Sequence, residues 1–425
     1  MARLHPRFSR KVLAALYPRF WQKVLAALLI VGVVPVALVS TVSIENTRRD
    51  LTTLGVTNIQ QRSTSTASAI DAYLQSRLGD IVLAGKLPDI VRFGQNLSDP
   101  AAKIAARQAL AAAAARSPEY ESVAVVDPNG TIVAASIQSD EGTSVKFSEY
   151  FTTALKGTPY VSDPSYSVIT NRPALFFSAP VTDGRVVLAV VRTRVNLAAV
   201  WDIVETDQGA VGEGAHSFLL DDYGIRLAVS ETKGRRDQAE SLVYKPIAPI
   251  DADTVTKLVA DRRFGQKTPD QLVVDPLPTL KAALDGLPKG KPTTAQFAYG
   301  TGVGEQRGVV TRLVAKPWAY VVAVPLTTYT KAADEATVNA LLAVAIGLLL
   351  SLVIGIVLTS SLVGPLRQLV AEATAVSSGD VDLRLARFDT RRGDDLTREV
   401  ASAFDRMLNA LRFYALTDNA THGDD

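Results

Sequence analysis

The chain contains no cysteine, only two methionines and only three histidines. Without cysteine, disulfide bonds and thiolate metal sites are excluded, and cysteine usage gives no information about the redox state of the compartment. His5, His216 and His422 are scattered, and none stands at ligand spacing from another, so ordinary core or surface positions explain them better than a metal centre. We therefore expect no metal ion and no cofactor.

The sequence also lacks a strong charge imbalance and a catalytic motif. The formal net charge is +2, which argues against a nucleic-acid partner. We find no glycine-rich nucleotide loop, kinase signature, cyclase motif, nucleophile elbow or paired His/Asp set. We therefore predict that the chain is not an enzyme. Its 425 residues, 47% of them hydrophobic, can build more than one domain.

Two long runs of apolar residues carry no charge: one from Val24 to Ile44, the other from Ala336 to Leu366. Each reaches the roughly 20 residues that a membrane-spanning helix needs, and such a helix tolerates Pro35. We predict spans at 24–44 and 338–363. The alternative for the first run is a cleaved signal peptide, but its apolar stretch exceeds the roughly 7–15 residues usual there.

Basic flanks predict the orientation. Residues 1–23 hold six basic side chains and no acidic one, and such flanks stay in the cytoplasm. We therefore expect residues 1–23 and 364–425 inside and 45–335 outside. The phrase "KVLAAL" occurs at 11–16 and again at 23–28, and its first copy either lies along the inner membrane face or belongs to an unstructured tail.

Residues 45–335 predict an α+β domain. Apolar residues at helical spacing follow the first span and indicate a long amphipathic helix, and an alanine-rich helix comes next. Then "YESVAVVDPNGTIVAAS" reads as strand, turn and strand, and "HSFLLDDYGIRLAVS" repeats its frame. Asp127, Gly130 and Ala134 match Asp221, Gly224 and Ala228 in spacing. Further strands follow each hairpin, so we predict two similar antiparallel sheets in tandem, produced by duplication.

This order of elements resembles the periplasmic double-Cache sensors of bacterial transmembrane receptors, which carry two PAS-like units in tandem. The phrases "SVAVVDPNGTIVAAS" and "SEYFTTALKGTPYVSDPSYSVITNRPALFFSAPV" support the resemblance. It implies a distal unit at about 115–205 that holds the ligand, within the segment at about 145–195. It also implies a proximal unit at about 214–327 that acts as a coupler, in which no ligand set stands out.

A small polar ligand needs a few converging polar groups, and the distal segment offers seven candidates: Tyr150, Tyr160, Asp163, Tyr166, Arg172, Arg192 and Arg194. Strand alternation predicts that Val187, Ala189, Val191, Thr193 and Val195 share one face, whereas Leu188, Val190, Arg192 and Arg194 share the other. Two guanidinium groups on one face suit a carboxylate.

Amino-acid-binding members of the family use an Arg-x-Trp-Tyr phrase and a later Asp. Here the phrase falls on 148–151 without its Arg, and the Asp position falls near Arg194, which reverses the charge. The departure favours an anionic ligand, such as a small carboxylate, over a standard α-amino acid. Two simpler interpretations stand beside this one: Arg192 and Arg194 as solvated residues of a sheet edge, and Tyr150 and Tyr160 as core aromatics.

After the second span, apolar residues at heptad spacing predict two coiled-coil seams, one at 366–376 and one at 400–414. This helix–connector–helix resembles a HAMP domain at 364–414, followed by a polar tail at 415–425. The resemblance rests on a proline, a Gly-Asp turn and "ASAFDRM", and it assigns signal relay to Pro365, Gly379, Asp395, Phe404 and Met407. It implies a parallel homodimer with a four-helix bundle. Of the family's Asp-Glu-x-Gly phrase only Asp395 remains.

Together these patterns predict a signal-transduction receptor of the cell inner membrane, which binds a small solute outside and relays a conformational change to the HAMP bundle. Two other classes remain: a membrane-anchored module that captures a solute for a transporter, and an envelope assembly module. The coiled-coil seams count against the first of these. For the output we expect either an output domain that has been lost or cut off, or a separate cytoplasmic partner.

Overall fold

The computed structural model describes residues 26–27, 30–184, 186–234, 243–265 and 267–358, and near the C-terminus 399, 402–403, 406–407 and 409–410. The chain divides into two compact units. One comprises residues 49–331, and the other comprises 1–48 together with 332–425. Four of the predicted relay residues, Pro365, Gly379, Asp395 and Phe404, lie outside the described residues; Met407 lies on a helical stretch with its side chain half exposed.

In the part of the chain that the structure describes, two helices are long and apolar enough to cross a membrane, as the sequence predicted. The first contains α3 (Val34–Ala84), and the second is α11 (Leu326–Leu358). In the unit that contains both apolar stretches, small residues meet: a Cβ atom on Gly32 would lie 3.6 Å from Ser351 Oγ. The side chains around this contact are mostly exposed leucine, isoleucine and valine, which suits a lipid environment.

The C-terminal part of α3 is the predicted amphipathic helix. Ile59, Ile70, Leu74 and Ile81 are all buried, and their spacing puts them on one stripe of the helix. Leu54, an apolar residue nearer the start of the same helix, is exposed. Two shorter helices follow, α4 (Pro88–Gln95) and α5 (Pro100–Ala114). The alanine-rich α5 begins where the Asp99 carboxylate accepts hydrogen bonds from two backbone amides.

The first sheet is antiparallel, with strand order β2-β1-β6-β5-β3 and β4 beside β5. Its strands are β1 (Tyr120–Val126), β2 (Ile132–Ala135), β3 (Tyr160–Val161), β4 (Ser165–Tyr166), β5 (Pro173–Asp183) and β6 (Val186–Asn196). Three short helices accompany them: η1 (Gln138–Asp140), α6 (Glu149–Leu155) and α7 (Ala198–Glu205). We call β1 to α7 the first module.

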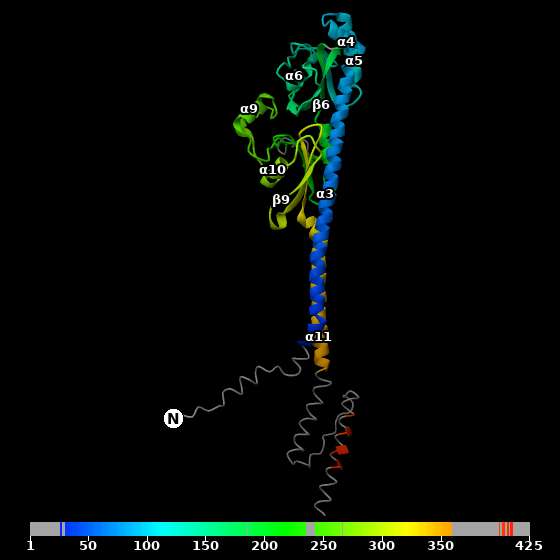
Figure 1. Cartoon of the computed structure of the whole chain (residues 1–425), viewed down its shortest axis with the longest axis vertical. Coiled ribbons are helices and arrows are strands. Elements are labelled where there is room, and N and C mark those ends of the chain that lie inside the picture. The colour runs from blue at the N-terminus through cyan, green and yellow to red at the C-terminus, as the bar shows by residue number, and fades with distance from the viewer. Residues whose placement is uncertain are drawn as a thin grey trace, which may run out of the picture. The chain divides into compact units, whose positions relative to one another are not determined.

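The second sheet repeats this order as β8-β7-β11-β10-β9. Figure 1 shows both sheets lying along α3. Its strands are β7 (His216–Leu220), β8 (Arg226–Val229), β9 (Thr294–Tyr299), β10 (Gln306–Arg312) and β11 (Ala319–Pro325). Among the described residues, the helices between β8 and β9 are η2 (Ser230–Thr232), α9 (Ala252–Ala260), η4 (Pro269–Gln271) and α10 (Pro278–Asp285), and η5 (Gly302–Gly304) follows β9. We call β7 to β11 the second module. The shared strand order confirms the predicted tandem α+β arrangement.

The two hairpins turn in the same way, as their matched spacing predicted. In the first, the amides of Asn129 and Thr131 donate to Asp127 Oδ1; in the second, those of Tyr223 and Ile225 donate to Asp221 Oδ1. The glycine of each turn has a positive φ, 89° at Gly130 and 77° at Gly224. These positions favour glycine because a Cβ atom is strained there.

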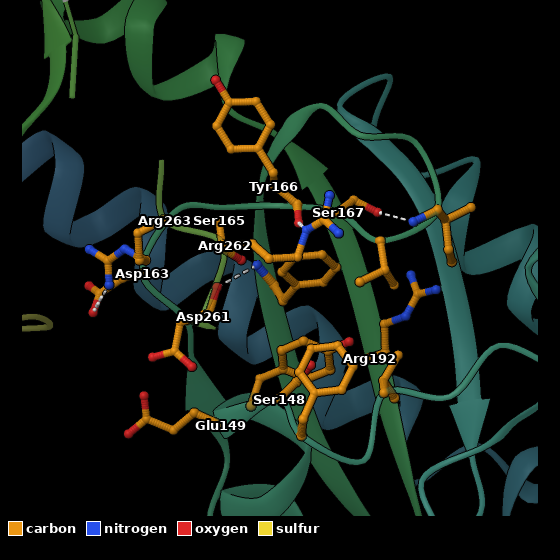
Figure 2. A pocket seen from close by; sticks show the side chains of 17 residues that line it. Ser148, Glu149, Asp163, Ser165, Tyr166, Ser167, Arg192, Asp261, Arg262 and Arg263 are labelled. Atoms are coloured by element: carbon orange, nitrogen blue, oxygen red, sulfur yellow. Dashed lines mark hydrogen bonds and ion pairs between the residues drawn. The ribbon is translucent and has the colours of Figure 1, made fainter. Parts of the chain in front are cut away.

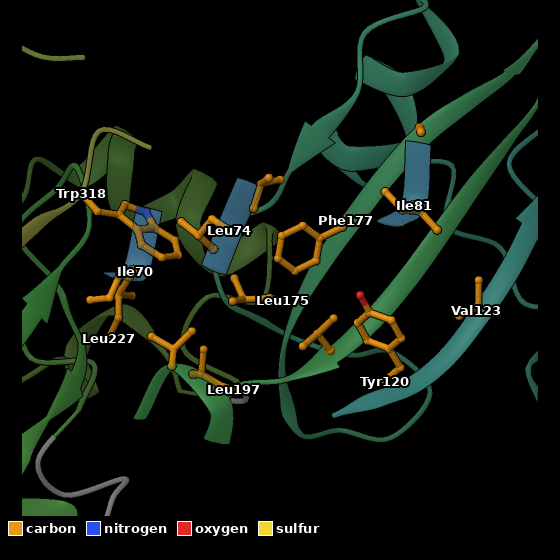
Figure 3. Close-up of a cluster of buried hydrophobic side chains, with 14 of the residues drawn as sticks. Ile70, Leu74, Ile81, Tyr120, Val123, Leu175, Phe177, Leu197, Leu227 and Trp318 are labelled. Carbon is orange, nitrogen blue, oxygen red and sulfur yellow. The ribbon is translucent and has the colours of Figure 1, made fainter. Parts of the chain in front are cut away.

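One apolar core joins α3 to both sheets (Figure 3). Ile70, Leu74 and Ile81 of α3 contribute to it together with Leu175 and Phe177 of the first sheet and Leu227 of the second; Trp318 joins it from the loop before β11. The opposite face of each sheet has its own cluster. The helix thus buries one stripe against two modules at once, which ties both modules to the chain that leaves the membrane segment.

Candidate functional site

A cavity of about 60 Å³ opens on the face of the first sheet that points away from α3 (Figure 2). The first module supplies most of its wall, and the turn after α9 of the second module supplies the rest. Charged and serine side chains share the lining with apolar ones: Glu149, Asp163, Asp261, Arg192, Arg262, Arg263, Ser148, Ser162, Ser165, Ser167, Val145, Phe147, Tyr150, Tyr166, Val168, Ile169 and Phe176. Such a mixture suits a small polar ligand.

From Ala189 to Val195 the alternation along β6 is the predicted one. At Leu188 the prediction is wrong, because a register shift between β5 and β6 turns this side chain toward Gly94 of α4. Ala189, Val191 and Val195 pack in the core around α3, and Val190 packs in the cluster of the opposite face. β6 lies between β1 and β5 and not at a sheet edge, and Arg192 and Arg194 are 0% and 2% exposed. The interpretation of these arginines as solvated residues of a sheet edge is therefore wrong.

Asp140 at the end of η1 compensates the two buried guanidinium groups. Its Oδ2 lies 3.2 Å from Arg192 Nη2 and 3.1 Å from Arg194 Nη1, and it also accepts a hydrogen bond from Ser122 Oγ. Arg194 forms a second ion pair with Glu121 at 2.9 Å. Burial, and then the neighbouring Arg194 charge, lower the pKa of Arg192, whereas Asp140 opposes the shift. A buried charge needs such partners.

Arg192 keeps one donor without a partner. Its Nη1 donates to the Ser122 carbonyl oxygen at 3.2 Å and its Nη2 to Asp140, but Nε is buried without a hydrogen-bond partner in the described part of the chain. Arg192 lines the cavity and Arg194 does not. A buried, unpaired donor is costly, so a ligand oxygen that reached Nε would bind with a gain.

Tyr150 is both a core aromatic and part of the wall. Its ring stacks on Phe176 with the centroids 4.7 Å apart and the planes at 13°, and it is 6% exposed. Burial raises the pKa of Tyr150, so its hydroxyl stays a neutral donor at physiological pH. The pair forms a flat apolar surface beside the Arg192 guanidinium.

Of the seven residues predicted from sequence, the structure brings four to the cavity: Tyr150, Asp163, Tyr166 and Arg192. The other three do not line it. The ring of Tyr160 packs on Lys316 Nζ at 5.1 Å, and Arg172 is exposed. Arg194 is buried with its carboxylate partners.

The turn after α9 is the part of the site that sequence reasoning missed. Asp261, Arg262 and Arg263 line the cavity although they belong to the second module, in which no ligand set was expected. The only signal in the sequence is the charged phrase "DRRFG" inside a long insertion, and no periodicity places it opposite the first module. The two segments meet only through the tertiary packing.

Asp163 joins the two modules at the wall of the cavity. Its carboxylate accepts from Trp318 Nε1 at 2.7 Å and forms ion pairs with Arg263 Nη1 at 2.9 Å and with Lys316 Nζ at 3.3 Å. Although burial opposes it, Arg263 and Lys316 lower the pKa of Asp163. Arg263 also forms an ion pair with Asp221. Burial raises the pKa of Asp221 to about 6, although the Arg263 charge opposes this shift. Asp163 is therefore occupied by protein partners.

Residues 357–413 match the family model of the HAMP domain. This confirms the resemblance drawn from the seams and the phrase around Phe404. With two apolar helices and a mixed α/β unit between them, the chain has the parts of a transmembrane receptor. These parts indicate signalling rather than catalysis, and a membrane protein with two spans. A search of curated proteins gave no match.

Solved sensor domains resemble the unit between the apolar helices. The sensor domain of the V. cholerae histidine kinase DctB matches with 14% identity and a TM-score of 0.49, over 64% of this chain and 96% of that one. The ligand-binding domain of the Campylobacter jejuni chemoreceptor Tlp3, in complex with 4-methylisoleucine, matches with 14% identity and a TM-score of 0.46, over 66% and 94%. The same domain with L-valine matches with 14% identity and a TM-score of 0.46, over 67% and 97%.

Proposed function

We propose that the chain is a two-span receptor of a bacterial inner membrane that binds a small solute with a carboxylate group in the first-module cavity. The observation that carries the proposal is Arg192, a fully buried cation on the cavity wall whose Nε has no partner in the described residues. A carboxylate oxygen is the acceptor that this donor lacks, and charge-assisted hydrogen bonds of this kind are the strong ones.

The proposed topology follows the basic flank. Six basic side chains and no acidic one in residues 1–23 favour a cytoplasmic N-terminus, so the unit between the spans lies in the periplasm and the HAMP domain in the cytoplasm. The distal and proximal units of the sensor are then the first and second modules.

The proposed relay uses α3, which leads into the sensor unit along the chain, and α11, which leads out of it. Residues 49–84 of α3 pack in the core that both sheets share, and α11 begins directly after β11. Ligand binding shifts the equilibrium between two packings of this core, provided that the ligand binds them with different affinity. The HAMP domain then repacks in a parallel homodimer and acts on an output domain or a separate cytoplasmic protein.

The proposal is tested by a thermal-shift screen of the full-length chain in lipid nanodiscs. The panel holds six acids (acetate, propionate, pyruvate, L-lactate, succinate and L-malate) and, for comparison, amino acids, amines and sugars. A ligand that binds the native state raises Tm by mass action. We expect a saturable rise with at least one acid, which disappears in Arg192→Met.

The other outcomes are informative. A rise that persists in Arg192→Met would place the bound acid elsewhere. A rise with amines or sugars alone would refute the carboxylate. No rise with any compound, while the chain stays folded, would favour an assembly module without a small ligand.

A further inference from the structure

The turn after α9 is bonded to the first module at the rim of the cavity. The Tyr166 amide donates to the Arg262 carbonyl oxygen at 2.9 Å, and Arg262 Nε donates back to the Tyr166 carbonyl oxygen at 3.2 Å. Arg262 Nη2 also donates to Asn171 Oδ1 at 2.7 Å. These three bonds hold a segment of the second module against the loop that closes the cavity.

Backbone strain gathers at the same place. Asn171, Tyr244 and Arg262 are the non-glycine residues with positive φ in the described part of the chain, at 50°, 58° and 56°. Arg262 bonds both Tyr166 and Asn171, and the ring of Tyr244 lies 5.8 Å from that of Tyr166. Left-handed backbone is unfavourable for arginine and tyrosine, and it persists where the surrounding structure holds it in place, often at ligand clamps.

The two arginines of this turn differ in their partners. Arg263 is buried and forms ion pairs with Asp163 and Asp221. Arg262 is half-buried and lines the cavity, and no carboxylate among the described residues forms an ion pair with it. Its bonds to a carbonyl oxygen and an amide oxygen orient the guanidinium but leave its charge uncompensated.

We propose that Arg262 is a second ligand-binding arginine, supplied by the second module. Arg262 binds either the same anionic group of the ligand as Arg192 does, or a second anionic group of the ligand. The inference rests on the proposed function, because it takes the same cavity as the ligand site. It adds that the site is composite: the ligand contacts both modules.

A composite site gives binding a direct effect on the junction between modules. Arg262 is adjacent to Arg263, and Arg263 holds Asp163 of the first module and Asp221 of the second. A ligand that contacts Arg262 stabilises this turn in the position that keeps Arg263 between its two carboxylates. Occupancy therefore favours one arrangement of the two modules, as a relay requires.

The experiment measures binding of the six acids named above to the full-length chain in nanodiscs, by isothermal titration calorimetry. The central variant is Arg262→Asn, because asparagine tolerates the left-handed backbone. Arg172→Asn is the matched control: it removes one positive charge from the loop between β4 and β5, next to Asn171, but Arg172 is exposed and does not line the cavity. Asn171→Gly removes the bond to Arg262 Nη2 without removing a charge.

Each acid that binds the wild-type chain should bind Arg262→Asn at least about tenfold more weakly, because a charged hydrogen bond is lost. The affinity should stay within about twofold for Arg172→Asn and Asn171→Gly, and Arg262→Lys should recover part of it.

Three results would overturn the inference. Unchanged affinity in Arg262→Asn, with binding abolished in Arg192→Met, would leave the proposed function standing and confine the site to the first module. Equal losses of affinity in Asn171→Gly and Arg262→Asn would show that the hydrogen bonds between the modules, and not the charge of Arg262, determine binding. No binding of any acid to the wild-type chain would refute the proposed function and the inference with it.

Discussion

The two modules have the same strand order, yet their central strands carry different side chains. Counted back from the turn residues Asp127 and Asp221, Ala124 of the first module corresponds to Phe218 of the second. Arg192 lies opposite Ala124, whereas Val321 lies opposite Phe218. One pair further along, Arg194 lies opposite Ser122 and Ala323 lies opposite His216.

The difference shows what converts a structural face into a binding face. In the second module the face holds Phe218, Phe297 and Val321 in a filled apolar cluster. In the first, small residues on β1 leave room for two guanidinium groups, which need Asp140 as a partner and leave a cavity beside Arg192. The same frame thus serves as core in one module and as candidate site in the other.

The largest expected effect comes from removing the partner of the two arginines. Asp140→Ala leaves Arg192 without a carboxylate and Arg194 with Glu121 alone, so the free energy of unfolding should fall by about 3–5 kcal/mol. Thermal unfolding of the full-length chain measures it. Adding Arg192→Val and Arg194→Ala, which copy the second module, should restore most of the loss.

The exposed Asp183→Ala is the control for this prediction, and it should change stability by less than about 0.5 kcal/mol. A similar loss in both single variants would show that the buried charges do not depend on Asp140.

The two hairpin glycines should differ in their tolerance of alanine. Both have positive φ, which alone costs about 1 kcal/mol. A Cβ atom on Gly130 would lie 2.6 Å from the backbone Cα of Lys146, whereas one on Gly224 would lie 3.0 Å from the Ile247 side chain. Gly130→Ala should therefore lower Tm more than Gly224→Ala does. The difference between the two variants should be about 1 kcal/mol or more in the free energy of unfolding. The reverse order would contradict the backbone contact.

The smallest expected effect appears only in acid. Although burial opposes it, hydrogen bonds from Arg107 and Lys103 lower the pKa of Glu141 in the first module from 4.5 to about 2. Because the folded-state pKa is depressed, the carboxylate stabilises the fold above pH 4.5, and this contribution is lost as the pH falls toward 2.

In Glu141→Gln, Tm should therefore decline less steeply between about pH 4.5 and 2. The wild-type chain should lose about 1 kcal/mol more unfolding free energy over this range, after allowance for solvent screening of the partly exposed partners of Glu141. Glu213→Gln, at an exposed position, should leave the acid decline unchanged. Parallel curves for wild type and Glu141→Gln would contradict the assignment.

Local patterns in the sequence predicted the frame of the molecule. The apolar runs, the helical stripe of α3 and the repeated Asp-x-x-Gly turns each depend on neighbours within a few residues, and so did the placement of Arg192 and Arg194 on one face. Their partner Asp140 could not be predicted, because it lies on a short turn more than fifty residues away from Arg192. The same holds for Arg262, which reaches Tyr166 only through the packing of one module on the other.

In this receptor the ligand binds through Arg192 in the first-module cavity, and not at the corresponding face of the second module. The most direct test is titration calorimetry with the acid that gives the largest thermal shift, on Arg192→Met and Arg312→Met. Arg312 is a matched arginine of the second module: it is 3% exposed and donates to the carbonyl oxygens of Pro317 and Leu284. We predict no detectable binding in folded Arg192→Met and wild-type affinity in folded Arg312→Met. Binding retained in Arg192→Met, or lost only in Arg312→Met, would contradict the claim.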